Sequence, residues 1–325
     1  MDRVKTIDRW PSQDALASIV RESVGNGGSP YNVLVDLARL GADFPLAGVG
    51  LVGDDEDGRA IVSNCRAHGI DPTQLRITAK APTSYTDVMT AADTGRRTFF
   101  HRRGANSHLG EDHFDFTRTT ARIFHLGYLL LLDQLDRIVD GRPAACKVLE
   151  RARSAGLLAS IDCVSEDGER FQKTVAPVLP YVDILFANDF ETEKLTGISL
   201  RVDDRIGATQ VALAGRNLLR RGVQSWAIVH FPEAVYACSI TGEEVWQPSV
   251  RVARDDIAGA AGAGDALAAA VLMGIHQGWA MADCLRLGVA AAAMSLYHPS
   301  CSEGVKSAGE CLALARRLGY QPVPA

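Results

Sequence analysis

From about residue 120 onward, short apolar runs bounded by turn residues alternate with amphipathic stretches of helical period. Four of the runs have the length and composition of buried strands: Arg122–Leu126, Leu158–Asp162, Val182–Ala187 and Trp226–His230. Strands that alternate with helices are typical of a mainly parallel sheet covered by helices. The pattern therefore predicts an α/β protein.

Three amphipathic segments are predicted helices: Pro143–Ala155, Ile206–Arg221 and Ser307–Leu318. Pro143 suits the first position of a helix, because its missing N–H costs no hydrogen bond there. Polar residues stand at the ends of the predicted strands, namely Asp162, Asn188 and His230. Ligands of open α/β sheets bind at this edge, although a polar residue also simply ends a strand.

Residues 84–103 break this pattern, since polar and apolar residues alternate there around Asp93-Thr94-Gly95. Alternation about such a turn predicts a β-hairpin. A hairpin here forms either a lid that projects from the main sheet or an antiparallel edge of that sheet. We favour the lid.

The charge balance argues against nucleic-acid and membrane partners. Lys and Arg number 34 against 39 Asp and Glu, which gives a net charge of −5. An acidic chain without long basic runs is poorly suited to bind nucleic acid or an anionic bilayer. The apolar stretch Ala258–Ile275 carries Asp265, which is costly inside a membrane.

The N-terminal segment and the cysteines predict a cytoplasmic protein with reduced thiols. The first residues, MDRVKTIDRWPSQD, lack the apolar core of a signal peptide. The 7 cysteines are scattered, with no C-x-x-C pair. The histidines likewise show no metal-binding spacing.

The segment Gly48–Gly53 matches the dinucleotide fingerprint G-x-G-x-x-G. The four acidic residues Asp54–Asp57 follow it directly and would repel a pyrophosphate. We therefore interpret the segment as a strand-to-helix turn.

The most informative segment is Ala258–Ala270, where a glycine-rich turn leads into an alanine-rich helix. The N–H groups of Gly262, Ala263 and Gly264 can form an anion hole at the helix N-terminus. Asp265 follows in the first turn, where burial raises the pKa of a carboxyl towards that of a general base. The combination favours phosphoryl transfer to a hydroxyl; alternatively, Asp265 caps the helix and the glycines only permit close packing.

A second glycine-rich loop, Gly27-Gly28, precedes another predicted helix, with Ser29 as N-cap and Pro30 at its first position. The glycines can expose backbone to a polyol, and Asn32 both donates and accepts hydrogen bonds. On its own, the segment is equally well explained as a loop and a helix start.

Five segments together resemble, in family order, the ribokinase-like family of carbohydrate kinases, the phosphofructokinase B type. They are GGSPYNVLVDLARLG at 27–41, GLVGDDEDG at 50–58, GRRTFFHRRGAN at 95–106, NDFE at 188–191 and GAGD at 262–265. The resemblance implies a single domain over 1–325, a three-layer α/β sandwich around a mainly parallel sheet. Its small β lid would come mainly from about residues 84–103.

The implied activity is Mg²⁺-dependent transfer of the ATP γ-phosphoryl group to a hydroxyl of a sugar or related polyol. The resemblance makes Asp265 the base and the amides at 262–264 the anion hole. Asn188 and Glu191 would organise Mg²⁺ and its waters, a set of oxygen ligands that this ion prefers. Gly27, Gly28, Asn32 and Arg103 would hold the substrate, and the exposed lid would allow a homodimer.

Members of the family begin with a core strand that carries a substrate-binding Asp at its end. Here the chain starts at Met1-Asp2, so that strand is expected to be missing. We expect Asp2 to be this substrate residue, the true start to lie upstream, and one central sheet position to be empty.

The chain departs from the family pattern at the nucleotide side. Gly259-Ala260-Ala261 replaces the usual Asp-Thr start of the glycine-rich motif, and His230–Ala234 and His298–Cys301 replace glycine-containing loops. Two alternatives therefore stay open: a nucleoside kinase of the same fold, and a sugar-binding or regulatory protein with impaired turnover.

Overall fold

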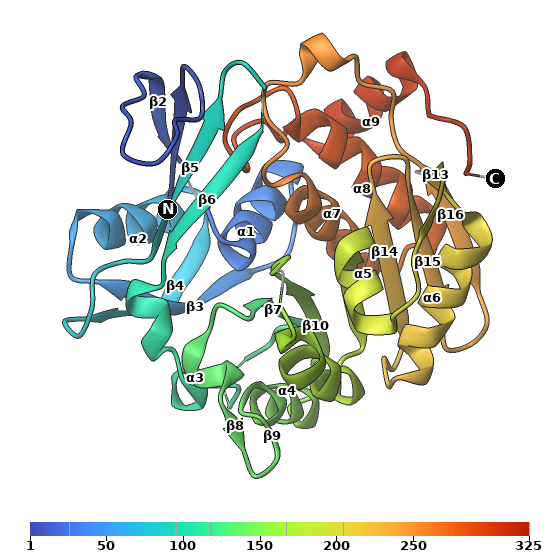
Figure 1. Cartoon of the computed structure of the whole chain (residues 1–325). Helices are drawn as coiled ribbons and strands as arrows, with labels where there is room; N and C mark the ends of the chain where they lie inside the picture. Colours follow the sequence, from blue (N-terminus) through green and yellow to red (C-terminus); the bar gives the residue numbers. More distant parts are fainter. Residues whose placement is uncertain (26, 95, 118, 167, 204, 325) are drawn as a thin grey trace.

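The computed structural model describes residues 1–25, 27–94, 96–117, 119–166, 168–203 and 205–324. Its largest sheet has the strand order β16-β15-β14-β11-β10-β7 (Figure 1). The bounds are β7 Ile123–Leu129, β10 Leu158–Cys163, β11 Ile184–Asn188, β14 Trp226–Phe231, β15 Ala234–Ser239 and β16 Glu244–Pro248. The four strands expected from the apolar runs are β7, β10, β11 and β14, which pair in parallel.

The sheet is buried on both faces because successive side chains of each strand point into different cores. In β11, Leu185 and Ala187 belong to one core, whereas Ile184 and Phe186 belong to the other. This explains why the strands are continuous apolar runs rather than alternating ones.

Helices cover both faces and complete three layers (Figure 1). One face is covered by α4 Ala145–Ser154, α5 Asp189–Thr196 and α6 Ala208–Arg220. The other face is covered by α1 Ser29–Leu40, α7 Ala263–Gln277, α8 Met281–Ser295 and α9 Ala308–Leu318. The predicted helices correspond to α4, α6 and α9. The short helix α3 Asp133–Asp136 follows β7.

Pro143 is not the first helical residue, contrary to the prediction. It ends the short strand β9, Arg142–Pro143, which pairs with β8, Ile138–Val139. This tight hairpin holds Pro143 extended, so α4 begins only at Ala145. A second two-stranded hairpin joins β12 Arg201–Val202 to β13 Arg205–Ile206.

Strands β3, Leu46–Gly53, and β4, Ile70–Thr78, form a separate parallel pair connected by α2, Glu56–Ala67. The fingerprint-like segment Gly48–Gly53 is the end of β3 rather than a turn. The chain turns instead at Asp54-Asp55, where the Asp55 carboxylate caps α2 by accepting a hydrogen bond from the Gly58 amide at 2.9 Å.

A third sheet, of order β2-β1-β5-β6, stands apart from the main sheet. Its strands are β1 Asp2–Ile7, β2 Ile19–Gly25, β5 Tyr85–Ala91 and β6 Arg97–Arg102. The hairpin predicted at 84–103 is β5 and β6, paired antiparallel; Gly95 of its predicted turn lies outside the described residues. Because this sheet shares no strand with the large one, we call it the lid, to which residues 2–25 also contribute two strands.

The first strand of the chain belongs to the lid. Asp2 begins β1 and is paired with β2 on one side and with β5 on the other. Between the described strands β3 and β7 there is no backbone pairing, although α1 packs against both. The lid thus takes up the N-terminal residues, and the central layer consists of two separate sheets.

All cysteines are buried free thiols, as expected for reduced cysteines. Across the described ranges, every helix is too short or too polar to cross a bilayer.

Candidate active site

The start of α7 combines free amides with a backbone shape that requires glycine. Gly262 is the N-cap and has a φ of 81°, in the left-handed region. A Cβ atom there would lie 2.1 Å from the carbonyl oxygen of Cys301. Among the described residues, no acceptor is bonded to the amides of Ala263 and Gly264, which as first-turn amides have no intrahelical partner. The predicted anion-hole segment therefore presents donors.

Asp265 lies directly beside these amides and is only 7% exposed. Its Oδ2 accepts a hydrogen bond of 2.7 Å from Nδ2 of Asn32. Burial raises the pKa of Asp265, the neighbouring Asp162 raises it further, and hydrogen bonds from Asn32 and Ser29 oppose the rise. A carboxyl with a raised pKa next to free amides can accept a proton while the amides hold an anion.

The glycine-rich loop before α1 belongs to the same site as Asp265 and the start of α7. Gly28 is the N-cap of α1, with a φ of 89°. A Cβ on Gly27 would lie 2.1 Å from Oδ1 of Asp2, so Asp2 of the lid contacts this loop. Burial raises the pKa of Asp2, and Cys301 Sγ donates to its Oδ2 at 3.1 Å. The structure therefore brings together Asp2, Gly27, Gly28, Asn32 and Asp265.

Ser29 does not cap α1, contrary to the prediction. Gly28 is the N-cap, and the Ser29 side chain instead donates a hydrogen bond to Oδ2 of Asp162. The positive φ of Gly28 turns the chain one residue earlier than the prediction assumed. Ser29, which is fully buried, thereby links α1 to the end of β10.

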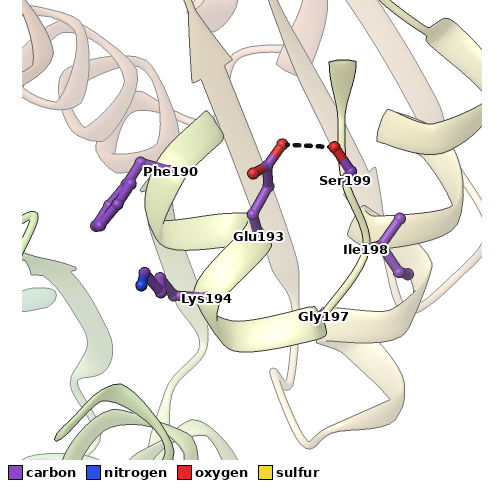
Figure 2. Close-up of a pocket in the computed structure, with 6 residues that line it drawn as sticks. All are labelled: Phe190, Glu193, Lys194, Gly197, Ile198 and Ser199. Carbon is purple, nitrogen blue, oxygen red and sulfur yellow. Dashed lines mark hydrogen bonds between the residues drawn. The ribbon is translucent and has the colours of Figure 1, made fainter. Parts of the chain in front are cut away.

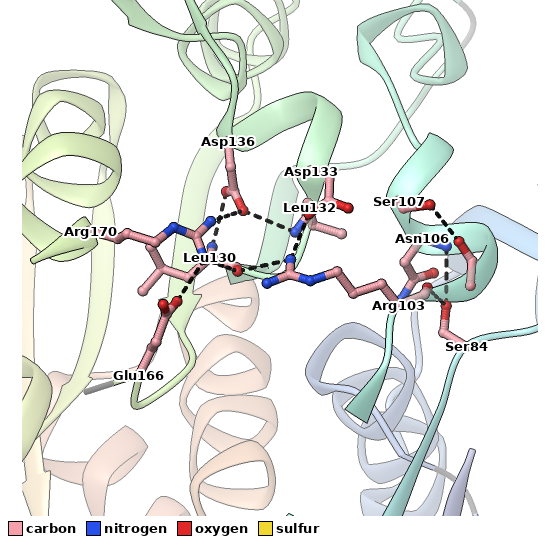
Figure 3. A network of polar contacts seen from close by, with 11 residues as sticks. Ser84, Arg103, Asn106, Ser107, Leu130, Leu132, Asp133, Asp136, Glu166 and Arg170 are labelled. Carbon is pink, nitrogen blue, oxygen red and sulfur yellow. Dashed lines mark hydrogen bonds and ion pairs between the residues drawn. The ribbon is translucent and has the colours of Figure 1, made fainter. Parts of the chain in front are cut away.

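Arg103 is held by protein atoms (Figure 3). Its guanidinium pairs with Asp133 at 2.7 Å and donates to the Leu130 carbonyl at 3.2 Å. Arg170 donates to the same carbonyl at 3.1 Å and pairs with Asp136. Arg103 thus fixes the segment that follows β7.

Asn188 and Glu191 form a capping box at the start of α5. The Asn188 side chain accepts from the Glu191 amide at 2.9 Å, and the Glu191 carboxyl accepts from the Asn188 amide at 3.0 Å. Burial raises the pKa of Glu191 to about 8. In the described ranges, no three His, Cys, Asp or Glu side chains are grouped as a ready-made metal site. The two oxygen donors fit Mg²⁺ only as partners of its waters, with phosphates completing the shell.

Three further residues at the site were missed as candidates: His125, Tyr128 and Asp36. The His125 ring is buried, which lowers its pKa to about 4, so its Nε2 at 3.9 Å from Asp162 makes no ion pair. Tyr128 has a φ of 61°, and the negative charge of Asp265 together with burial raises its pKa. Asp36 is fully buried, and neither carboxyl oxygen has a hydrogen-bond partner among the described residues. Asp162 was expected from the sequence to lie at the sheet edge where ligands bind, but it was given no role.

Segments that depart from the family pattern also lie next to one another in the structure. A Cβ on Gly259 would lie 3.0 Å from Cα of Pro299, so the altered glycine-rich loop packs on the altered His298–Cys301 segment. His230, at the end of β14, faces Gly264, where a Cβ would lie 3.3 Å from its ring.

A surface hollow of about 440 Å³ lies along α5 (Figure 2). It is lined by Phe190, Glu193, Lys194, Gly197, Ile198 and Ser199. None of the site residues expected from the sequence lines it, so this hollow does not mark the site at α7.

Comparisons with known proteins agree with this arrangement. The model of the pfkB family carbohydrate kinases matches residues 4–308. The chain is 30% identical over 186 residues to fructokinase-2 of Solanum lycopersicum, a match that covers 55% of this chain and 54% of the relative. The chain thus spans about half the length of this relative.

A longer match is with the ATP-dependent ribose-1-phosphate kinase of Halopiger xanaduensis, at 29% identity over 81% of this chain and 77% of the relative. Among solved structures, Arabidopsis thaliana ribokinase complexed with ribose and ATP superposes with a TM-score of 0.76 at 20% identity, covering 97% of this chain and 95% of that one. This likeness confirms the three-layer fold expected from the sequence.

Proposed function

Because the chain belongs to the pfkB family of carbohydrate kinases, we propose that it transfers the γ-phosphoryl group of ATP to a hydroxyl of a sugar or related polyol. The similar proteins named above are kinases of fructose, of ribose 1-phosphate and of ribose, and one of them was solved with a sugar and ATP bound. In this proposal residues 1–325 act as one kinase domain, with the lid over its substrate side.

One observation carries the proposal: the buried Asp265 carboxyl, held by the 2.7 Å hydrogen bond from Asn32, stands beside the amides of Ala263 and Gly264, which have no acceptor among the described residues. Asp265 would accept the proton of the attacking hydroxyl, since its raised pKa suits a general base near neutral pH. The amides of residues 262–264 would hold the oxygens of the phosphoryl group during transfer, with the positive end of α7 adding to the attraction.

The substrate would lie between the lid and the start of α1. Asp2, Gly27, Gly28 and Asn32 supply a carboxylate, exposed backbone and an amide, which suit the hydroxyls of a polyol. The contact of Asp2 with Gly27 supports a shared surface for the substrate. Arg103, which holds the segment after β7 through Asp133 and Leu130, would contact the substrate or its developing phosphate.

Mg²⁺ is part of the proposal. It would neutralise charge on the nucleotide phosphates, and Asn188 and Glu191 would hold its waters. The raised pKa of Glu191 supports this role indirectly. Without a metal ion the carboxyl tends to retain its proton, and a nearby cation would favour its ionised form.

Measuring ADP formation over a panel of sugars, sugar phosphates and nucleosides tests the function. We expect turnover with at least one sugar or sugar phosphate, and turnover lower by about two to four orders of magnitude in the Asp265→Asn variant. Turnover with nucleosides alone would contradict the substrate class. Sugar binding without turnover under any nucleotide would contradict the activity and would favour a binding protein.

A further inference from the structure

Cys301, in the segment that follows α8, contacts two parts of the candidate site. Its Sγ donates a hydrogen bond to Oδ2 of Asp2 at 3.1 Å. Its carbonyl oxygen lies 2.1 Å from the position of a Cβ on Gly262, the N-cap of α7. The side chain therefore reaches the lid residue expected to bind the sugar, and the main chain lies against the turn that carries the anion-hole amides.

The Cys301 thiol acts as a hydrogen-bond donor in this contact. The residue is only 4% exposed, and burial together with the neighbouring Asp2 raises the pKa of the thiol well above its usual value. The thiol therefore keeps its proton, which it offers to the carboxyl group. A thiol is a weak donor, but a hydrogen bond to an ionised acceptor is stronger than one between neutral groups.

The hydrogen bond also defines which oxygen of Asp2 lies towards the loop before α1. Oδ1 is the atom nearest to the Cβ position of Gly27, at 2.1 Å, whereas Oδ2, which accepts the thiol, lies at 2.6 Å. Gly27 has no side chain to cover Oδ1. The thiol thus holds one oxygen and leaves the other on the side of the glycine-rich loop.

The segment His298–Cys301 contacts the lid at a second point. Gly25, the last residue of β2, pairs with Asp2, and a Cβ on Gly25 would lie 3.3 Å from Cβ of Ser300. The Ser300 hydroxyl and Nδ1 of His298 form a hydrogen bond of 2.8 Å within the segment. Two neighbouring residues of this segment thus contact two paired residues of the lid, so the thiol is placed beside the lid by more than one contact.

We propose that Cys301 is a positioning residue for the sugar: its thiol holds Oδ2 of Asp2 so that Oδ1 is presented to a substrate hydroxyl. The Cys301 main chain ties this contact to the anion-hole turn at Gly262. The step is non-covalent, and the cysteine stays reduced. The inference rests on the proposed function in that Asp2 is taken as a substrate-binding residue.

The first test separates the thiol from the main chain of Cys301. Cys301→Ala removes the donor, so the KM for the sugar should rise by about fivefold to tenfold. The kcat should change by less than about twofold, because the carbonyl contact with Gly262 remains. Cys301→Ser restores a donor of similar shape and should return KM to within about twofold of the wild-type value. A merely structural thiol would give no such recovery.

Two further variants serve as controls. Cys311, on α9, is another buried free thiol, but its Sγ donates to the Lys306 carbonyl. Cys311→Ala should lower the thermal stability and leave KM unchanged. In an Asp2→Asn background, Cys301→Ala should add much less to KM than it does in the wild-type protein, because the effects of two residues in direct contact are not additive.

A measurement in the ligand-free protein separates this inference from the proposed function. It is a ¹³C NMR titration of the aspartate carboxyl carbons, with Asp2→Asn used to assign the resonance. Besides Cys301, the titratable groups that interact with Asp2 are the Met1 amino group, Tyr128 after β7 and Asp265 of α7, and the variants leave all three in place. Loss of the thiol should raise the Asp2 midpoint by about 0.5–1 pH unit, and Cys301→Ser should reverse the rise.

The outcomes distinguish the two proposals. A raised Asp2 midpoint in Cys301→Ala that Cys301→Ser reverses supports the inference even when no sugar is turned over, a result that contradicts only the proposed function. The inference is overturned by an unmoved midpoint or KM in Cys301→Ala, by a KM that stays high in Cys301→Ser, or by an equal rise in Cys311→Ala. Turnover by the wild-type protein would then leave the proposed function standing.

Discussion

The Asn32 amide donates to the Asp265 carboxylate across 2.7 Å, although 233 positions separate the two residues in the chain. The bond joins the first turns of α1 and α7, helices that pack directly on each other. It orients Asp265 while leaving the Asn32 Oδ1 without a hydrogen-bond partner among the described residues. A buried acceptor without a partner is costly, so this oxygen is well suited to receive a hydroxyl of a bound polyol.

Asp265→Asn should reduce kcat by about two to four orders of magnitude, because general-base catalysis contributes about 10²–10⁴-fold. The amide has nearly the same shape and relieves repulsion with Asp162, so the fold should stay intact. Steady-state kinetics measure the loss, and calorimetric sugar binding checks that the site persists. A variant with near wild-type kcat would exclude Asp265 as the base.

Gly262→Ala should cost both stability and activity, since a methyl group would overlap the Cys301 carbonyl and the residue has a positive φ. Gly278→Ala is the matched control. It ends the same helix with a φ of 75°, and nothing lies within 4 Å of its Cβ position. Thermal unfolding should show a modest loss for Gly278→Ala and a larger one for Gly262→Ala, with kcat reduced only in the latter. Equal effects would mean that the contact with Cys301 is unimportant.

Asp36→Asn should make the stability less dependent on pH. Burial raises the pKa of Asp36 well above that of an unfolded Asp. The unfolded chain therefore loses this proton near pH 4 while the folded chain retains it, so stability falls as the pH rises from there towards the folded pKa. Urea unfolding at pH 5 and pH 8 measures how far the free energy of unfolding falls between these two pH values. This fall should be smaller in Asp36→Asn than in the wild-type protein by about 1 kcal/mol or more, since burying an unpaired ion costs several kcal/mol. A decrease equal to that of the wild-type protein would contradict the prediction.

Glu191→Gln separates the capping role from the metal role. Gln also completes a capping box, so the melting temperature should change little. Loss of the carboxylate should raise the Mg²⁺ concentration needed for half-maximal ADP formation by about tenfold, as expected for an outer-shell partner of a metal. If the Mg²⁺ dependence stays the same, Glu191 serves only the helix.

The lid should mediate a homodimer, because it exposes large apolar side chains. Trp10 and Phe100 stack with ring centroids 6.2 Å apart and are 49% and 51% exposed. Phe100→Asp should convert a dimer to a monomer in light scattering after gel filtration. Leu213→Asp, on α6 and 44% exposed, should leave the assembly unchanged. A wild-type monomer at micromolar concentration would refute the expectation.

Much of the fold could be predicted because the signals are local. The strands β7, β10, β11 and β14 are continuous apolar runs, and the lid hairpin alternates with period two. The starts of helices were less predictable. Ser29 and Pro143 both have residue types that suit a helix start, yet Gly28 and a short hairpin decide where α1 and α4 begin.

The candidate site was predictable only where its residues occur in motifs. Asp265, Asn32 and the two glycine loops belong to such motifs, and the fold brings them together. His125, Tyr128 and Asp36 have no local signature, since their importance comes from what packs beside them. The substrate contact predicted for Arg103 from its motif stays a prediction, and its ion pair with Asp133, 30 residues away, could not be read from the sequence.

The site draws on segments from both ends of the chain, with Asp2, Asn32, Asp162, Asp265 and Cys301 all meeting around it. Joining segments so remote in sequence is slow, because long loops must close before their contacts form. During refolding, helical signal should thus recover well ahead of catalytic competence. Activity in this chain should then report complete tertiary assembly, and we expect no excised fragment to retain it.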